Sequence, residues 1–266
     1  MINWLTRLLK TPKTQIGFLL TLIFITAFFN NPSLKAIFVF TLSIGSTLLF
    51  DLLFLKIRRV KSFFLSASLV TGSIIGLLTS PLANWYIPIA IGAFAMFSKN
   101  FIRFGNRHVF NPTAFGLLVG TLILATPVSW WAVSWQQFTT QNLEFIIYFL
   151  IFLSPAFVSM VKMKRYRITL SFLIVYALLA QFLNLNSSIL NFIADPTTLF
   201  FATVMLPEPM TTPNNHVKQI LFGIFVGLLA IFVSSPILNS KFLIIDSVDP
   251  LVLSLLLGNL VFYKLR

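Results

Sequence analysis

Apolar runs of about 20 residues recur along this chain, and they constrain its fold more than any other feature. As a helix, a run of that length crosses a hydrocarbon core of about 30 Å. Hydrophobic residues make up 58% of the chain and charged residues only 9%, too few to cover a soluble fold with polar surface. The sequence therefore predicts an all-α polytopic membrane protein in which residues 1–266 form a single transmembrane domain of about ten helices. The predicted spans are residues 15–30, 34–55, 62–80, 82–98, 110–130, 143–161, 168–186, 188–206, 218–238 and 249–263.

The distribution of Lys and Arg orients these spans. With the N-terminus inside, 17 of the 19 Lys and Arg residues fall in the loops of one face, and only Lys35 and Lys241 fall on the other. Cytoplasmic loops carry such an excess of basic residues. We therefore expect a multi-pass protein of the cell inner (plasma) membrane with both termini cytoplasmic. Topology and contact with lipid headgroups explain the net charge of +13, so no nucleic-acid partner is expected.

Two proline-containing stretches predict an internal repeat. "FNPTAFGLLVG" (residues 110–120) and "VDPLVLSLLLG" (residues 248–258) share their proline, Leu-Leu and glycine positions at an offset of 138 residues. Asn111 and Asp249 suit helix N-caps, and the prolines after them suit the first helical position. Five spans separate the copies, so the two helices would start at opposite faces, as in an inverted-topology repeat of residues 1–130 and 143–266. The alternative is chance, since any two apolar runs with a proline look alike.

Two acids fall within the predicted spans. Asp195 precedes Pro196 in "ADPTTLFFATVML", and we expect it to cap a helix, although an acid at membrane depth can also mark a functional site. Asp51 lies near the inner end of its span, where we expect it to pair with nearby cations.

Two loops predicted on the inner face carry the polar groups most suited to binding. They are "SKNFIRFGNRHVFNPT" before the fifth span and "LPEPMTTPNNHVKQ" between the eighth and ninth. Their helix N-termini, amides, hydroxyls and cations suit an anionic, heteroaromatic ligand such as a flavin phosphate. The alternative is a pair of solvated basic loops. No catalytic motif or metal-ligand spacing is present. The candidate cofactor-binding residues are Arg107, Asn111, Thr113, Glu208, Thr211 and Thr212.

A longer stretch of the chain carries a family resemblance. "SASLVTGSIIGLLTSPLANWYIPIAIGAFAMFSKNFIRFGNRHVFNPTAFGLLVG" (residues 66–120) resembles the RnfD/NqrB family, whose members are membrane components of the Rnf electron transport complex and of the sodium-translocating NADH:quinone reductase. "KRYRITLSFLIVYALL", "PEPMTTPNNHVKQILFGIFVGLLAIF" and "VDPLVLSLLLGN" resemble later parts of that family in the same order. The resemblance implies ten helices in a five-plus-five inverted arrangement.

The same resemblance implies a function. Family members carry electrons between a cytoplasmic donor and a quinone or partner subunit through bound flavin, in some cases coupled to sodium or proton movement. This chain would be a flavin-carrying or non-catalytic subunit of an oxidoreductase complex. Its partners would be other membrane subunits and iron–sulfur or NAD-binding subunits, because the chain has no cysteine to hold an iron–sulfur cluster of its own.

The chain departs from the family at one motif. Many members attach FMN to a threonine of an "SGAT"-like motif in the loop after the Asn-Pro helix. Here that loop, residues 126–142, contains Thr139 and Thr140 but no such motif, so the expected cofactor is non-covalent FMN or riboflavin. Two alternatives stay open: a non-redox ion or small-solute transporter with a midplane site near Asp195, Thr197 and Thr198, and a scaffold subunit without a cofactor.

Overall fold

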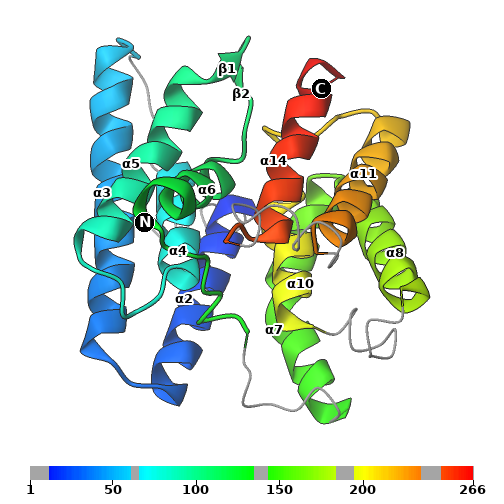
Figure 1. Ribbon diagram of the computed structural model, residues 1–266, viewed down its shortest axis with the longest axis horizontal. Helices are drawn as coiled ribbons and strands as arrows, with labels where there is room; N and C mark the ends of the chain where they lie inside the picture. The colour runs from blue at the N-terminus through cyan, green and yellow to red at the C-terminus, as the bar shows by residue number, and fades with distance from the viewer. Residues whose placement is uncertain (1–11, 61–65, 135–142, 184–194, 235–246, 266) are drawn as a thin grey trace, which may run out of the picture.

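The computed structural model describes residues 12–60, 66–134, 143–183, 195–234 and 247–265 (Figure 1). The described part is all-α apart from one short hairpin, which confirms the all-α part of the predicted fold class, and a helix overlaps each of the ten predicted spans. The α-helices of the described residues are α2 (Pro12–Asn30), α3 (Leu34–Ile57), α4 (Ser66–Leu78), α5 (Tyr86–Phe101), α6 (Pro112–Leu124), α7 (Leu143–Lys162), α8 (Tyr166–Phe182), α10 (Pro196–Phe200), α11 (His216–Ser234) and α14 (Pro250–Phe262). The hairpin pairs β1 (Arg103–Phe104) with β2 (Arg107–His108), a π-helix, η1 (Phe201–Met205), continues α10, and a 3-10 turn, η2 (Tyr263–Leu265), follows α14.

Two of these helices, α3 and α11, are long and apolar enough to cross a membrane by length and composition. Several of the others are apolar but shorter. The fifth predicted span, residues 110–130, is an example, because its helix α6 ends at Leu124. Ala125 adopts the left-handed conformation with φ 51°, and Thr126 precedes a proline, which disfavours further helix.

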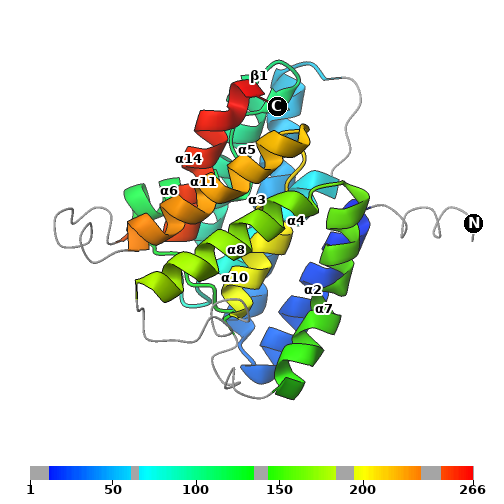
Figure 2. The same cartoon turned by 90° about the vertical axis from the view of Figure 1, so that its right-hand side faces the viewer.

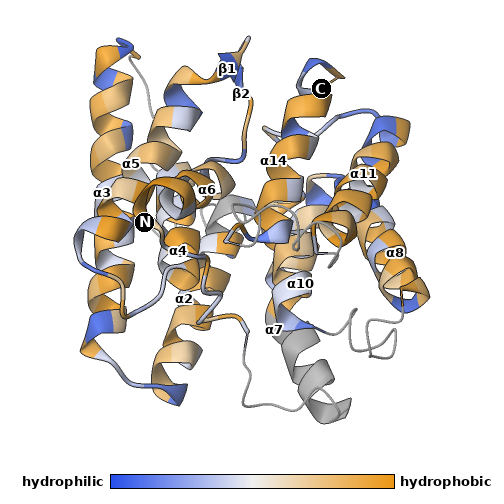
Figure 3. Ribbon diagram, viewed as in Figure 1, coloured by the Kyte–Doolittle hydropathy of each residue, from blue (hydrophilic) through white to orange (hydrophobic). Residues whose placement is uncertain are grey.

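Large apolar side chains also point away from the protein interior. Phe29, Leu34 and Phe182 are 74%, 83% and 82% exposed, respectively. Figure 3 shows apolar residues along most of the helix surfaces. Hydrophilic residues gather at the end of α3, at the β1–β2 hairpin, at the start of α11 and at the end of α14, which point to the same side of the molecule.

Three helices begin with the same N-capping arrangement. Asn111, Asp195 and Asp249 are the N-caps of α6, α10 and α14, each with ψ close to 120° and each followed by a proline. In each case the side-chain oxygen accepts a hydrogen bond from the backbone N–H three residues later. These bonds come from Ala114, Thr198 and Val252. The three predicted caps are therefore confirmed, including the structural role expected for Asp195.

The same helix contacts occur in both halves of the chain. In the first half α5 packs against α3 and α6, and in the second half α11 packs against α8 and α14. Among the described residues the halves contact each other through α2 with α7 and through α6 with α14. Figure 2 shows α8 beside α11 and α2 beside α7.

The two glycines of the repeated stretch also occupy similar positions. A Cβ atom on Gly120 would lie 2.7 Å from Cγ1 of Ile91 in α5, and one on Gly258 would lie 2.7 Å from Cγ2 of Val226 in α11. A real Cβ atom does not approach another carbon so closely, so a side chain at either position would displace the neighbouring side chain of α5 or α11.

Asn111 lies where the two halves meet. Its backbone N–H donates to Oδ1 of Asn259 in α14 at 2.7 Å, and its Nδ2 donates to the carbonyl of Met205 at 3.2 Å. Asn259 follows the cap Asp249 by ten residues, a separation of about 15 Å along the helix axis. The N-cap of α6 therefore lies beside the C-terminal part of α14, and not beside the N-cap Asp249.

Candidate functional site

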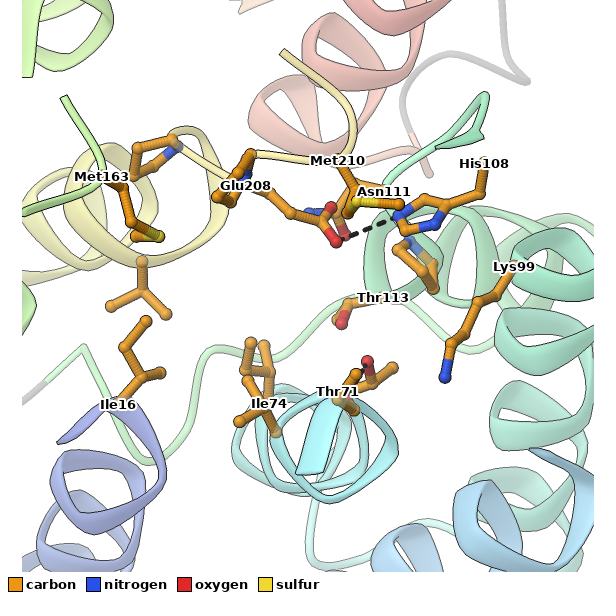
Figure 4. A pocket seen from close by; sticks show the side chains of 16 residues that line it. Ile16, Thr71, Ile74, Lys99, His108, Asn111, Thr113, Met163, Glu208 and Met210 are labelled. Carbon is orange, nitrogen blue, oxygen red and sulfur yellow. Dashed lines mark hydrogen bonds and ion pairs between the residues drawn. The ribbon is translucent and has the colours of Figure 1, made fainter. Parts of the chain in front are cut away.

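A cavity of about 250 Å³ lies between the two halves of the chain (Figure 4). Its floor comes from the apolar and hydroxyl side chains of α4, its walls from α5 and the start of α6, and its opposite side from the loop that follows η1. The residues that line it are Ile16, Ala67, Val70, Thr71, Ile74, Lys99, His108, Asn111, Pro112, Thr113, Met163, Val204, Pro207, Glu208, Pro209 and Met210.

Three of the six predicted binding residues line this cavity: Asn111, Thr113 and Glu208. Thr211 and Thr212 are fully buried and hold the glutamate in place. The Thr211 hydroxyl donates to Oε2 of Glu208 at 3.1 Å, and the Thr212 hydroxyl donates to the Glu208 carbonyl at 2.7 Å.

His108 and Glu208 join the two predicted inner loops. Nε2 of His108 lies 3.1 Å from Oε1 of Glu208, and the two side chains are 7% and 25% exposed. Figure 4 shows them facing each other beside Asn111. This contact joins the two loops at the cavity and places an imidazole and a carboxylate together on its lining.

Lys99 brings a cation to the same cavity, although no local sequence pattern indicates it. Its Nζ lies 2.7 Å from Oδ2 of Asp51, which is fully buried. Asp51 also accepts hydrogen bonds from Asn100 Nδ2 at 2.9 Å and from the Ser68 hydroxyl. The prediction that Asp51 pairs with a cation is confirmed, but its partner comes from α5 and not from the basic residues that follow it in the sequence. The pair therefore fixes α3 to the helix that lines the cavity.

Asn259 is a second residue of the site that the sequence motifs do not indicate. Besides accepting from the Asn111 backbone, it donates from Nδ2 to the carbonyl of Thr211 at 3.3 Å. One buried amide thus ties α14 both to the start of α6 and to the loop that carries Glu208. An amide inside an otherwise apolar helix was the available signal, since buried polar side chains are seldom without a partner.

Arg165 fixes the other side of that loop. It is 5% exposed, and its guanidinium donates to the carbonyl of Pro213 and to Oδ1 of Asn214, the latter at 2.5 Å. Burial lowers the pKa of Arg165, and the neighbouring charge of Arg107 lowers that pKa further. Arg107, a predicted binding residue, precedes His108 in β2 but is not among the residues that line the cavity.

The residues of the transporter alternative lie elsewhere. Asp195 caps α10, and its partner Thr198 is buried in that helix. Neither residue, nor Thr197, is among those that line the cavity. Thr139 and Thr140 lie outside the described residues.

The chain matches no protein-family model and no curated protein. The function is therefore argued from the residues and their geometry.

Proposed function

We propose that this chain is a polytopic protein of the inner (plasma) membrane with ten spans in two inverted five-helix repeats, residues 1–130 and 143–266, and with both termini cytoplasmic. Three observations support this arrangement. The helix contacts of the first half recur in the second, the glycines at 120 and 258 make equivalent close contacts, and the hydrophilic ends of α3 and α14 and the hydrophilic start of α11 point to one side (Figure 3). Helices shorter than a full span would cross as part of a bundle whose irregular backbone is buried in protein.

We further propose that the chain is a flavin-carrying membrane subunit of an Rnf- or Nqr-like electron transport complex. The observation that carries this proposal is the cavity of about 250 Å³ in which Asn111, Thr113 and Glu208, selected from loops about 95 residues apart in the sequence, come together. A mainly apolar cavity with a few convergent polar groups is typical of sites for ring-containing ligands.

The lining residues fit a non-covalent FMN or riboflavin ring. Apolar side chains such as Ile74 and Met210 would pack on the ring faces, and Asn111 and Thr113 would hydrogen-bond its polar edge. When bound, the flavin would supply one- and two-electron transfer. The His108–Glu208 pair would offer hydrogen-bonding groups beside the ring, and the Lys99 ammonium group, paired with Asp51, would lie at the cavity wall.

The remaining parts of the complex would come from other chains. Without cysteine, this chain relies on partner subunits for iron–sulfur clusters, and NAD-binding and further membrane subunits would complete the path from a cytoplasmic donor to a quinone. Coupling to ion movement belongs to the same proposal, and no residue is assigned to it.

Purification from a flavin-replete host tests the cofactor directly. The detergent-solubilised protein should show flavin absorbance, and denaturation should release flavin into solution. Ala67→Phe, which fills the cavity from α4, should abolish flavin retention, whereas Leu69→Phe, on the exposed face of the same helix, should leave it unchanged. Colourless wild-type protein that releases no flavin would rule out the proposed cofactor.

A further inference from the structure

Two buried arginine nitrogen atoms beside the cavity have no hydrogen-bond partner among the described residues. They are Nε of Arg165 and Nη1 of Arg107. Arg165 as a whole is only 5% exposed, so its free N–H group is shielded from bulk water. A buried donor without an acceptor is costly, and native proteins seldom tolerate one unless a ligand or ion completes it.

The charge around these two groups is also unbalanced. The acceptors that Arg165 does have, the carbonyls of Pro209 and Pro213 and the amide oxygen of Asn214, are all neutral. Glu208 lies in the loop to which Arg165 donates, but its carboxylate is already bonded to His108 and Thr211. Two guanidinium groups close enough to repel each other therefore lack a dedicated counter-charge in the part of the chain that the structure describes.

Neither arginine lines the cavity, but each lies next to a residue that does. Arg107 directly precedes His108, and Arg165 donates to the carbonyl of Pro209; both His108 and Pro209 line the cavity. Arg165 is also the N-cap residue of the 17-residue helix α8 and makes no side-chain capping bond there. The positive end of the helix dipole then adds to the potential of the two guanidinium groups.

We propose that Arg107 and Arg165 bind a phosphate group at the edge of this cavity. Guanidinium groups bind phosphate through paired N–H···O bonds, and the two free nitrogen atoms supply donors for it. The cavity, at about 250 Å³, holds a ring system but not a whole nucleotide, so a phosphate would lie outside it. Two sources carry this chemistry: the phosphate of FMN, which rests on the proposed flavin function, and the headgroup of an anionic phospholipid, which does not.

The first experiment compares FMN with riboflavin, which differ by the phosphate. Flavin-free protein in nanodiscs of phosphatidylcholine is titrated with each, and binding is followed by flavin fluorescence. FMN should bind on the order of tenfold to a hundredfold more tightly, the effect of one charged hydrogen-bonding group. Within Arg107→Gln and within Arg165→Gln, FMN and riboflavin should bind with equal affinity. Lys164→Gln, which removes an exposed charge from the same loop, should retain the preference for FMN.

Arg107→Gln keeps the test decisive if Arg165→Gln unfolds the loop. Nη1 of Arg107 has no hydrogen-bond partner among the described residues, whereas Arg165 bonds three groups of the neighbouring loop, so Arg107→Gln should cost less stability. Equal affinity for FMN and riboflavin, unaffected by Arg107→Gln, would overturn FMN as the source of the phosphate while leaving flavin binding intact.

The second experiment tests the lipid source. Protein is purified from membranes that contain phosphatidylglycerol, and bound lipid is measured by mass spectrometry. Loss of phosphatidylglycerol in Arg107→Gln but not in Lys164→Gln would support the site with a lipid phosphate, even if neither flavin binds and the proposed function fails. Equal retention by all variants, together with no FMN preference, would overturn the phosphate site.

Discussion

The buried pair of Asp51 and Lys99 provides a test of what holds the first half of the chain together. Asp51 is fully buried in α3 and accepts hydrogen bonds from Lys99 and Asn100 of α5 and from Ser68 of α4. Replacing it with leucine leaves the ammonium group of Lys99, 16% exposed, without its counter-charge. Removing one partner of a buried ion pair costs about 3–5 kcal/mol.

A double-mutant cycle separates the pair from the rest of the network. Asp51→Leu and Lys99→Met should each reduce the free energy of unfolding by about 3–5 kcal/mol, while the double variant should recover most of that loss because no buried charge remains. Unfolding by dodecyl sulfate, followed by circular dichroism, provides the measurement. Lys56→Met removes an exposed cation from the end of the same helix and should change stability by less than about 0.5 kcal/mol.

One result would refute this reasoning. If both single variants unfold within about 1 kcal/mol of the wild type, then Asp51 does not hold α3, α4 and α5 together, and its contacts contribute little. A double variant no more stable than the single variants would instead show that the neutral hydrogen bonds, and not the ion pair, carry the energy.

Three further predictions follow from local geometry. Gly258→Ala should destabilise the protein by about 1–3 kcal/mol because its Cβ would overlap α11, whereas Gly45→Ala, with open space around it, should raise the free energy of unfolding by roughly 0.5–1 kcal/mol; comparable unfolding of both variants would contradict the crossing. Asp195→Ala should cost about 1 kcal/mol through loss of its cap, and unchanged stability would argue for a role other than capping. Because the chain has no cysteine, Leu82→Cys and Asn215→Cys should react with an impermeant maleimide from opposite sides of oriented membranes, and reaction from one side would exclude the proposed topology.

The helices could be predicted because their signals are local. A long apolar run and an Asx-Pro pair act within a few residues, so the ten segments and the caps at Asn111, Asp195 and Asp249 follow from short stretches of sequence. Helix ends were less predictable. Hydropathy continues past Leu124 to residue 130, but a left-handed Ala125 and a following proline stop the helix earlier.

The site was only partly predictable because its contacts are long-range. The two inner loops supplied Asn111, Thr113 and Glu208, but no local pattern indicates that Lys99 would turn toward Asp51, 48 residues away. Arg165 could not be predicted as a site residue for another reason. It lies in a basic cluster that the positive-inside rule already explains, so only its burial distinguishes it from its neighbours.

The two caps of the repeated stretch differ by one atom, and the structure provides a reason. Asn111 uses its oxygen for the cap and its Nδ2 group to donate to the carbonyl of Met205. Asp249 uses one oxygen for its cap and the other to accept from the indole N–H of Trp130 at 2.6 Å. The first position faces an acceptor and requires an amide, whereas the second faces a donor and requires a carboxylate.

Exchanging the two residue types tests this assignment with the caps kept intact. Asn111→Asp would set a carboxylate oxygen against the Met205 carbonyl, and Asp249→Asn would set an amide N–H against the Trp130 N–H. Each buried mismatch should cost about 1–3 kcal/mol. Asn215→Asp, at an exposed position before α11 where the side chain accepts from backbone N–H groups, is the control and should be neutral or slightly stabilising. If the three variants unfold alike, the residue at each cap is set by capping alone and not by the partner that it faces across the repeat.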